Sequence, residues 1–320
     1  MRVGYPCLNL SLPCRPSRTF RLANLTWERL RQTLAGNLAC LEEMVHWNAA
    51  RGLLFLRITS DLVPLASRPE NAFPWDEEFA AEFARIGELM RSYGMRITMH
   101  PGQYTLLNSP RKEVVAAALA DLRYHARVLD LLGLDTAAKI QIHVGGVYGQ
   151  KERAIARFLN AVETLPSEIR RRLVVENDER FYTFTDVLEI HRKTGLPVVF
   201  DVLHHELNPD ELDVSDAISA QKETWGPEDG LPIVDYSSPL PGGKFGSHAH
   251  HLDEEHFRRF LGKTAGYDFD LMLEVKDKER SALRALEILR GDPRLVTKGA
   301  PGLEPSLAEG SPMFPQEAAP

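Results

Sequence analysis

The chain has 320 residues, of which 43% are hydrophobic, so it is long enough to bury a large core. Its 45 acidic and 38 basic side chains give a net charge of −7, which excludes a protein coated in positive charge but allows a local basic patch. The sequence has no apolar run of membrane-spanning length and no apolar signal-peptide core in its first 20 residues, which favours a cytoplasmic protein.

Short apolar stretches with a two-residue period alternate with amphipathic stretches along most of the chain. The predicted strands are 3–5, 53–58, 96–100, 139–143, 173–176, 197–201, 232–235 and 270–274. The predicted helices are 27–50, 77–93, 112–132, 152–165, 185–194, 215–224, 254–264 and 279–290. Thr26 and Thr185 are the expected N-terminal caps of the first and fifth helices. Eight strand–helix units predict a single (β/α)8 TIM barrel over residues 1–295.

Two features fall outside this alternation. From about Thr297 onward, Pro, Gly and small residues dominate, and they bury too little surface to order a backbone. A disordered tail is therefore predicted over residues 296–320. The three cysteines are an odd number without a zinc-binding spacing, and they are predicted to be free thiols: Cys7, Cys14 and Cys40.

Six predicted strands end on a His, Asp or Glu side chain, which the alternation places opposite its apolar neighbours. These residues are His100, His143, Glu176, Asp201, Asp235 and Glu274. In a barrel they would face the axis at the carboxyl-terminal mouth, where barrel enzymes place their chemistry. One such residue alone is more often a satisfied core group, but four carboxylates brought together repel one another unless cations lie between them. The pattern therefore predicts a metal centre.

The mixture of ligands narrows the choice of metal. Imidazole nitrogen together with carboxylate oxygen suits Zn, Mn or Fe better than Ca or Mg, and bridging carboxylates hold two ions about 3.5–4 Å apart. His204 follows Asp201 by three positions in a predicted loop, and with His248 it is a candidate ligand for a third ion. Three further histidines are interpreted as residues of the rim: His205, His250 and His251.

The chain resembles the UV damage endonucleases, a family of DNA repair enzymes whose barrel is related to endonuclease IV. The matching segments are GYPCLNL (4–10), HPGQY (100–104), IHVGGVYGQK (142–151), VVENDER (174–180), FDVLHHELNP (200–209), SHAHHL (247–252) and LEVKDKE (273–279). They run in order over about residues 1–290, and in combination they are specific to the family, whereas the barrel alone is not. The resemblance implies a bacterial, metal-dependent nuclease, commonly with manganese. Such an enzyme nicks double-stranded DNA immediately 5′ of cyclobutane pyrimidine dimers and 6-4 photoproducts, leaving a 3′-hydroxyl and a 5′-phosphate.

The resemblance also divides the ligands among ions. The first ion would be held by His100, His143 and Glu176, and the third by His204 and His248. The second would be held by Glu176, Asp201, Asp235 and Glu274. The residues expected to carry the catalysis are Glu176, Asp201, His204 and Glu274. The family usually has Lys and His where this chain has Ile233 and Asp235, so two tightly held ions are expected and a third is expected to bind weakly.

Recognition of the lesion is assigned by the resemblance to residues of two loops. Gln103 and Tyr104, after a Pro-Gly turn, would enter the duplex as a wedge, while Tyr5 and Asn9 would contact the lesion. Arg68 stands where relatives often have histidine, and it would contact a phosphate. From the residues alone, a glutamine that caps its turn and a tyrosine packed on the rim are the simpler alternatives.

Other functions stay open on the residues alone. A divalent-metal sugar isomerase places similar ligands at its strand ends but acts on a small polyol and needs no wedge. An abasic-site endonuclease would differ in the lesion and not in the chemistry. A non-catalytic binding module would leave six converging ligands without a role. The sequence indicates no protein partner, and a monomer is expected.

Overall fold

The computed structural model describes residues 1–296 as a closed barrel of eight parallel strands that pair in chain order. The strands are β1 (Val3–Pro6), β2 (Phe55–Ile58), β3 (Arg96–Met99), β4 (Lys139–His143), β5 (Leu173–Glu176), β6 (Val198–Asp201), β7 (Ile233–Tyr236) and β8 (Asp270–Leu273). Pairing of β8 with β1 closes the barrel. The predicted single (β/α)8 fold is confirmed. The predicted tail, apart from Val296, lies outside the described residues.

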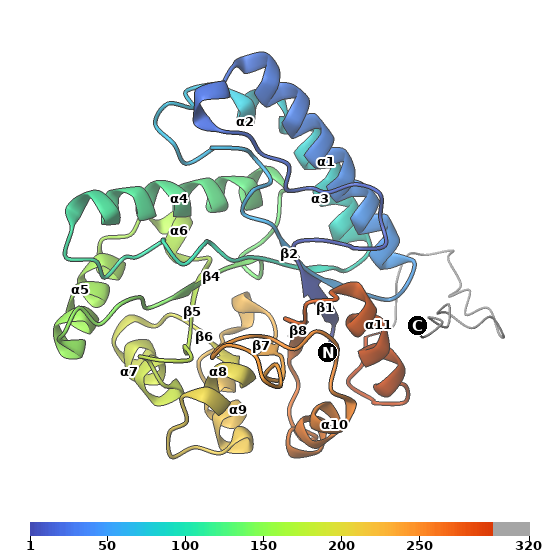
Figure 1. The fold of residues 1–320 in the computed structure, drawn as a ribbon, viewed down its shortest axis with the longest axis vertical. Helices are drawn as coiled ribbons and strands as arrows, with labels where there is room; N and C mark the ends of the chain where they lie inside the picture. The colour runs from blue at the N-terminus through green and yellow to red at the C-terminus, as the bar shows by residue number, and fades with distance from the viewer. Residues whose placement is uncertain (297–320) are drawn as a thin grey trace.

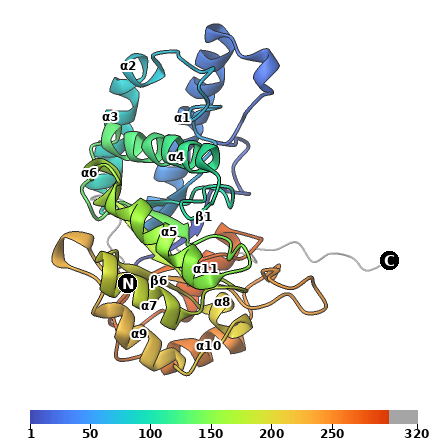
Figure 2. The same ribbon diagram turned by 90° about the vertical axis from the view of Figure 1, so that its left-hand side faces the viewer.

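Helices surround the strands in Figure 1, and Figure 2 shows α4 on one side of the strands with α9 and α10 on the other. They are α1 (Trp27–Ala49), α2 (Trp75–Glu78), α3 (Ala80–Ser92), α4 (Lys112–Leu131), α5 (Lys151–Glu163), α6 (Ser167–Arg170), α7 (Phe184–Thr194), α8 (Val202–Leu207), α9 (Val214–Lys222), α10 (Glu254–Lys263) and α11 (Glu279–Ile288). Two short 3-10 turns are η1 (Leu22–Asn24) and η2 (Pro227–Asp229). Within residues 1–296, no helix is both long and apolar enough to span a membrane.

The barrel has an apolar layer inside and a thicker apolar layer between strands and helices. The inner layer consists of Phe55, Val174, Val199, Ile233 and Met272. Residues two positions further along each strand point to the same side, so they lie above this layer at the carboxyl-terminal mouth. Four of the six predicted strand-end ligands occupy these positions, namely Glu176, Asp201, Asp235 and Glu274, whereas His100 and His143 follow Thr98 and Gln141 by two residues.

The observed helices differ from the predicted ones in several places, and α6 was not predicted. The predicted helix 77–93 is divided at Phe79 into α2 and α3. Helix α7 is capped by Thr183 and not by Thr185: the Thr183 hydroxyl accepts from the Asp186 amide, and Asp186 bonds back to the Thr183 amide. The segment after β6, predicted as a loop, is the helix α8, because the Asp201 side chain caps it.

The prediction of three free thiols is wrong for two of them. Cys14 in the β1–α1 loop and Cys40 on α1 form a disulfide, with their Cα atoms 5.7 Å apart, and only Cys7 is free. The two cysteines are 26 residues apart, and they meet because the loop folds back along the helix. Spacing in the sequence does not show this approach, since it depends on the tertiary path of the loop.

Candidate metal centre at the barrel mouth

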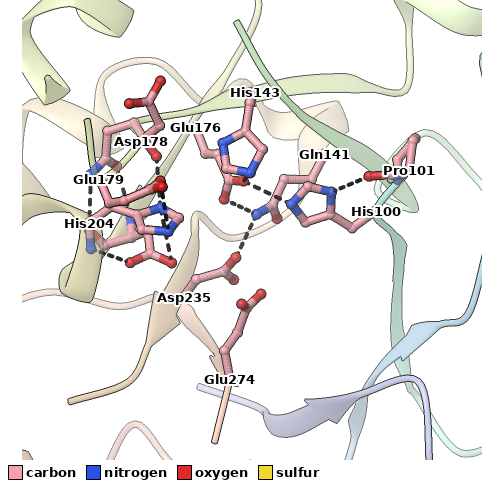
Figure 3. A network of polar contacts seen from close by, with 12 residues as sticks. His100, Pro101, Gln141, His143, Glu176, Asp178, Glu179, His204, Asp235 and Glu274 are labelled. Carbon is pink, nitrogen blue, oxygen red and sulfur yellow. Dashed lines mark hydrogen bonds and ion pairs between the residues drawn. The ribbon is translucent and has the colours of Figure 1, made fainter. Parts of the chain in front are cut away.

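The strand ends bring seven of the eight predicted ligands into three linked groups (Figure 3). The groups are His100–His143–Glu176, Glu176–Asp201–His204 and Asp201–Asp235–Glu274. Within each group, one ligand atom per residue lies within 4.8 Å of the others. Glu176 belongs to the first two groups and Asp201 to the last two, so the groups form a chain across the mouth.

In the first group, two imidazole nitrogens converge on one carboxylate oxygen. The Nε2 atoms of His100 and His143 lie 2.8 and 2.7 Å from Oε1 of Glu176. Nδ1 of His100 donates to the carbonyl of Pro101 at 3.0 Å, since a carbonyl can only accept. Nε2 of His100 therefore faces the Glu176 oxygen with a lone pair, and a cation, which is a proton in the metal-free protein, has to lie between these two acceptors. This arrangement fits a metal ion.

The second group is built by the start of α8. The Asp201 carboxylate accepts from the backbone amide of His204 at 2.7 Å, which places the imidazole beside it. Nδ1 of His204 donates to the carbonyl of Asn177 at 3.0 Å, so its Nε2 is again free to bind a metal. The Asn177 side chain also bonds to both backbone groups of Asp201, at 2.9 and 3.0 Å, and so ties the ends of β5 and β6 together.

Burial and neighbouring charges act in opposite directions on the pKa values of Glu176 and His204. Burial acts to raise the pKa of Glu176, but the charges of His143 and His100 hold it well below its usual range. Burial acts to lower the pKa of His204, but Asp201 and Glu176 raise it to about 9. Burial raises the pKa of Asp201. The carboxylates thus depend on positive charge at the imidazoles, which a bound metal ion would supply in place of protons.

The third group contains a side chain that was not predicted. Arg57, on β2, donates from Nη2 to both oxygens of Asp235 at 2.9 and 2.8 Å, and from Nη1 to Glu274. Gln141, on β4, donates to Asp235 and to Glu176. Burial acts to raise the pKa of Glu274, but Arg57 lowers it to about 2. Asp235, which is fully buried, has its pKa raised well above the usual range by burial, against the charge of Arg57.

The remaining histidines near the mouth do not join these groups. His248 lies with its Nε2 3.8 Å from Glu274, and its ring centroid is 6.5 Å from that of His204. His205 bonds to the carbonyl of Leu212, and His251 to Asp277. The resemblance implied that His204 and His248 hold a third ion together. In the structure His204 belongs to a group with Glu176 and Asp201, and His248 does not.

The predicted wedge residues protrude from the rim. Gln103 and Tyr104 are exposed, Tyr104 by 69%. The next residue, Thr105, is buried, and its hydroxyl donates to Asp121 on α4 at 2.8 Å, which anchors the turn. Burial and the charges of Asp121 and Asp61 raise the pKa of the Tyr104 hydroxyl, against the charge of the exposed Arg68.

Tyr5 and Asn9, the predicted lesion contacts, are buried. The Tyr5 hydroxyl donates to Asn48 at 2.7 Å and accepts from Asn9 at 2.8 Å. Oδ1 of Asn9 accepts from the amide of Ser11 at 2.9 Å. In this arrangement both side chains hold the β1–α1 loop, and their contact with a lesion stays a prediction.

Comparison with known proteins agrees with this geometry. Residues 1–298 match the family model described as UV-endonuclease UvdE. The chain belongs to the UvdE family. It is 34% identical over 308 residues to the UV DNA damage endonuclease of Bacillus cereus strain ATCC 10987, and the match covers 92% of this chain and 97% of that protein. Membership confirms the predicted enzyme class, an endonuclease.

Solved structures show the same relationship. The crystal structure of SacUVDE aligns with a TM-score of 0.87 at 43% identity, covering 91% of this chain and 98% of that one. Endonuclease IV from Thermus thermophilus aligns with a TM-score of 0.54 at 22% identity, covering 78% and 93% of the two chains. The second likeness shows a shared barrel only.

Exposed apolar side chains in this UvdE-family chain gather at the mouth. Among the described residues, the large hydrophobic side chains that are exposed are Leu10, Leu22, Tyr104, Tyr148, Phe181 and Phe245. Five lie in loops that follow strands and Leu22 lies in η1 of the β1–α1 connection, so all belong to segments at the carboxyl-terminal side of the barrel. Arg157 lies over the ring of Tyr148 at 5.3 Å and Arg180 over that of Phe245 at 5.6 Å. Aromatic faces paired with arginines are suited to stacked bases and phosphates.

Sequence reasoning missed three polar residues that organise the centre: Arg57, Gln141 and Asn177. A signal was present for the first two, because each is a polar residue inside an apolar strand at an inward-facing position. Gln141 precedes His143 by two residues and Arg57 follows Phe55 by two residues, so each shares the inward face with that neighbour. Asn177 follows Glu176 directly, and only the structure shows that it bonds to β6.

Proposed function

We propose that this protein nicks double-stranded DNA immediately 5′ of UV photoproducts by metal-assisted hydrolysis, leaving a 3′-hydroxyl and a 5′-phosphate. The observation that carries the proposal is the pair of imidazole nitrogens that face Glu176 within a rim of exposed aromatic side chains. The exposed turn that carries Gln103 and Tyr104 supports a DNA duplex as substrate, because a small polyol would not need such a protruding side chain. The names of the curated relatives agree with this substrate.

The side chains fit divalent ions, with manganese our choice because imidazole and carboxylate ligands are mixed. His100, His143 and Glu176 would hold one ion, and Glu176, Asp201 and His204 another. Bound there, such ions would lower the pKa of a water molecule and offset negative charge on the phosphate and the departing oxygen. The catalytic ligands are thus Glu176, Asp201 and His204, with Glu274 beside them.

The rest of the chain orients these ligands and the DNA. The carbonyls of Pro101 and Asn177 fix the two imidazoles with Nε2 directed into the mouth. Burial of Glu176 in a low-dielectric site strengthens its interaction with any cation. Tyr104 would replace the stacking lost when a damaged base pair opens, and Gln103 would offer amide groups to the bases opposite. The exposed Arg68 would contact a phosphate.

The experiment that tests this function compares three plasmids. Metal-loaded protein is incubated with untreated, UV-irradiated or depurinated supercoiled plasmid, and nicked circles are counted on a gel. We expect nicking of the UV-irradiated plasmid at a rate well above that of the untreated one. Preference for the depurinated plasmid would favour an abasic-site endonuclease instead. Sequencing of the nicked ends tests the 5′ position and the 3′-hydroxyl.

Removal of the wedge is expected to abolish discrimination and to leave the metal centre intact. A Gln103→Ala, Tyr104→Ala double variant loses the stacking face that offsets the cost of unstacking a base, a few kcal/mol. We expect the ratio of binding to lesion and undamaged duplexes to fall by about 10- to 100-fold. Gel-shift titration measures the ratio, and elemental analysis serves as the control. An unchanged ratio would show that Gln103 and Tyr104 only form the turn and do not take part in recognition.

Removal of the hydrogen bond between Thr105 and Asp121, which anchors the turn, is expected to lower lesion preference by less than removal of Gln103 and Tyr104. Thr105→Val keeps the shape but removes the hydroxyl that donates to Asp121, which costs about 1–3 kcal/mol when a buried partner is left unpaired. We expect lesion preference to fall by about tenfold, because the turn is then less ordered. Thr105→Ser, which keeps the hydroxyl, is the matched control. Equal preference in the Val and Ser variants would show that this anchor has no role in recognition.

A further inference from the structure

Arg57 is a buried cation inside the proposed metal centre. It follows Phe55 of the inner apolar layer by two residues, so both side chains point into the barrel. Its side chain is 3% exposed. Because arginine does not lose its proton in proteins, this charge is permanent, and a buried charge is stable only with partners.

Arg57 and Gln141 together give both oxygens of Asp235 a hydrogen-bond donor. Nη2 of Arg57 donates to both Asp235 oxygens, at 2.9 and 2.8 Å, and Nε2 of Gln141 donates to Oδ2 at 2.5 Å. Oε1 of Gln141 accepts from Arg57 at 3.0 Å, which sets the orientation of the amide. Figure 3 shows Gln141 between Glu176 and Asp235. Asp235 thus has donors on both oxygens without any metal ion.

We propose that Arg57 takes the place of a metal ion between Asp235 and Glu274, so that bound ions lie only at the two histidine-containing groups. This inference rests on the proposed function only in assuming that the centre holds metal ions.

The three ligand groups differ in a way that supports this division. The first two contain imidazoles whose Nε2 lone pairs can bind a metal ion, and none of these imidazoles is among the hydrogen-bond partners of Arg57. The third group, Asp201–Asp235–Glu274, consists of carboxylates alone, and two of them, Asp235 and Glu274, already form ion pairs with the Arg57 guanidinium. A divalent ion added there would lie against a fixed positive charge, which opposes its binding.

For the reaction, Arg57 is a positioning residue. Its Nη1 holds Oε1 of Glu274, while Oε2 of Glu274 faces His248 at 3.8 Å. Glu274 is partly exposed at the mouth, whereas Arg57 is buried, so Arg57 acts on the centre through Glu274. A cation built into the chain is also unaffected by chelators, unlike a third ion.

The test counts metal ions in purified protein after loading with Mn²⁺ and exhaustive dialysis, by elemental analysis. Wild type is expected to retain two ions per chain. Arg57→Met removes the charge at similar length, so the freed carboxylates are expected to bind one further ion. Arg57→Lys keeps the charge and is expected to retain two. Arg57→Met with Asp235→Leu replaces the buried pair by apolar side chains, and it is also expected to fold and retain two ions.

Each count decides for or against the inference. Three ions retained by wild type, or two by a folded Arg57→Met variant, would overturn it. Loss of an ion in the folded double variant would also overturn it, because Asp235 would then be a ligand. If Arg57→Met alone does not fold, the number of ions retained by the double variant tests the inference. Nicking of UV-irradiated plasmid by wild type is scored separately, so failure of the proposed function would not be mistaken for failure of the ion count.

Discussion

Glu176→Ala is expected to reduce incision of UV-irradiated plasmid by about 10³-fold or more while the barrel stays folded. Glu176 belongs to both histidine-containing ligand groups, so its removal weakens two proposed ion sites at once. The apolar layer beneath Glu176 does not depend on this side chain, so the barrel should persist without it. Nicking rates and metal content are the measurements, with circular dichroism to establish folding.

Glu163→Ala is the matched control for this variant. Glu163 is an exposed carboxylate at the end of α5, and it makes none of the ligand contacts described above. We expect it to nick at the wild-type rate and to retain the same metal content. If Glu176→Ala cut damaged DNA at a rate near that of the control, the proposed centre would be wrong.

The positions of the strand-end ligands could be predicted because they depend on two simple periodicities. In a parallel barrel every strand ends at the same mouth, and the two-residue period decides which side chains face inward. Asp235 shows this: it shares a face with Ile233, which lies in the inner apolar layer directly below. The convergence of six residues therefore required no knowledge of tertiary packing.

What could not be predicted depends on contacts across the barrel or along loops. Arg57 on β2 pairs with Asp235 on β7, and these strands are not neighbours in the sheet, so only closure of the barrel brings them together. The disulfide depends in the same way on the path of one loop. The predicted loop position of His204 was wrong because a capping contact by Asp201 starts a helix.

Removal of metal is the other change with a large expected effect. Treatment with a strong chelator followed by dialysis should abolish nicking of UV-irradiated plasmid. The fold should persist, because a dry apolar layer that includes Phe55, Ile233 and Met272 lies beneath the ligands and does not depend on them. Circular dichroism of the chelated protein should therefore match that of the loaded protein at room temperature.

The loaded protein should nevertheless unfold at a higher temperature. An ion that binds only the folded state, at ~100-fold excess over its dissociation constant, stabilises it by about 2.7 kcal/mol. For a chain of this size the midpoint should rise by roughly 4 °C for each such ion, which differential scanning calorimetry measures.

Re-addition of different ions to the chelated protein tests the ligand chemistry itself. Mn²⁺ should restore both the nicking activity and the unfolding midpoint, because it accepts the Nε2 atoms of His100, His143 and His204 as well as carboxylate oxygens. Ca²⁺ should restore neither to a comparable extent, since it requires six to eight oxygen ligands and binds imidazole poorly. Recovery with Ca²⁺ equal to that with Mn²⁺ would show that carboxylates alone bind the ions. The histidines would then be positioned for another purpose, and the convergence of two imidazoles on Glu176 would need a different explanation.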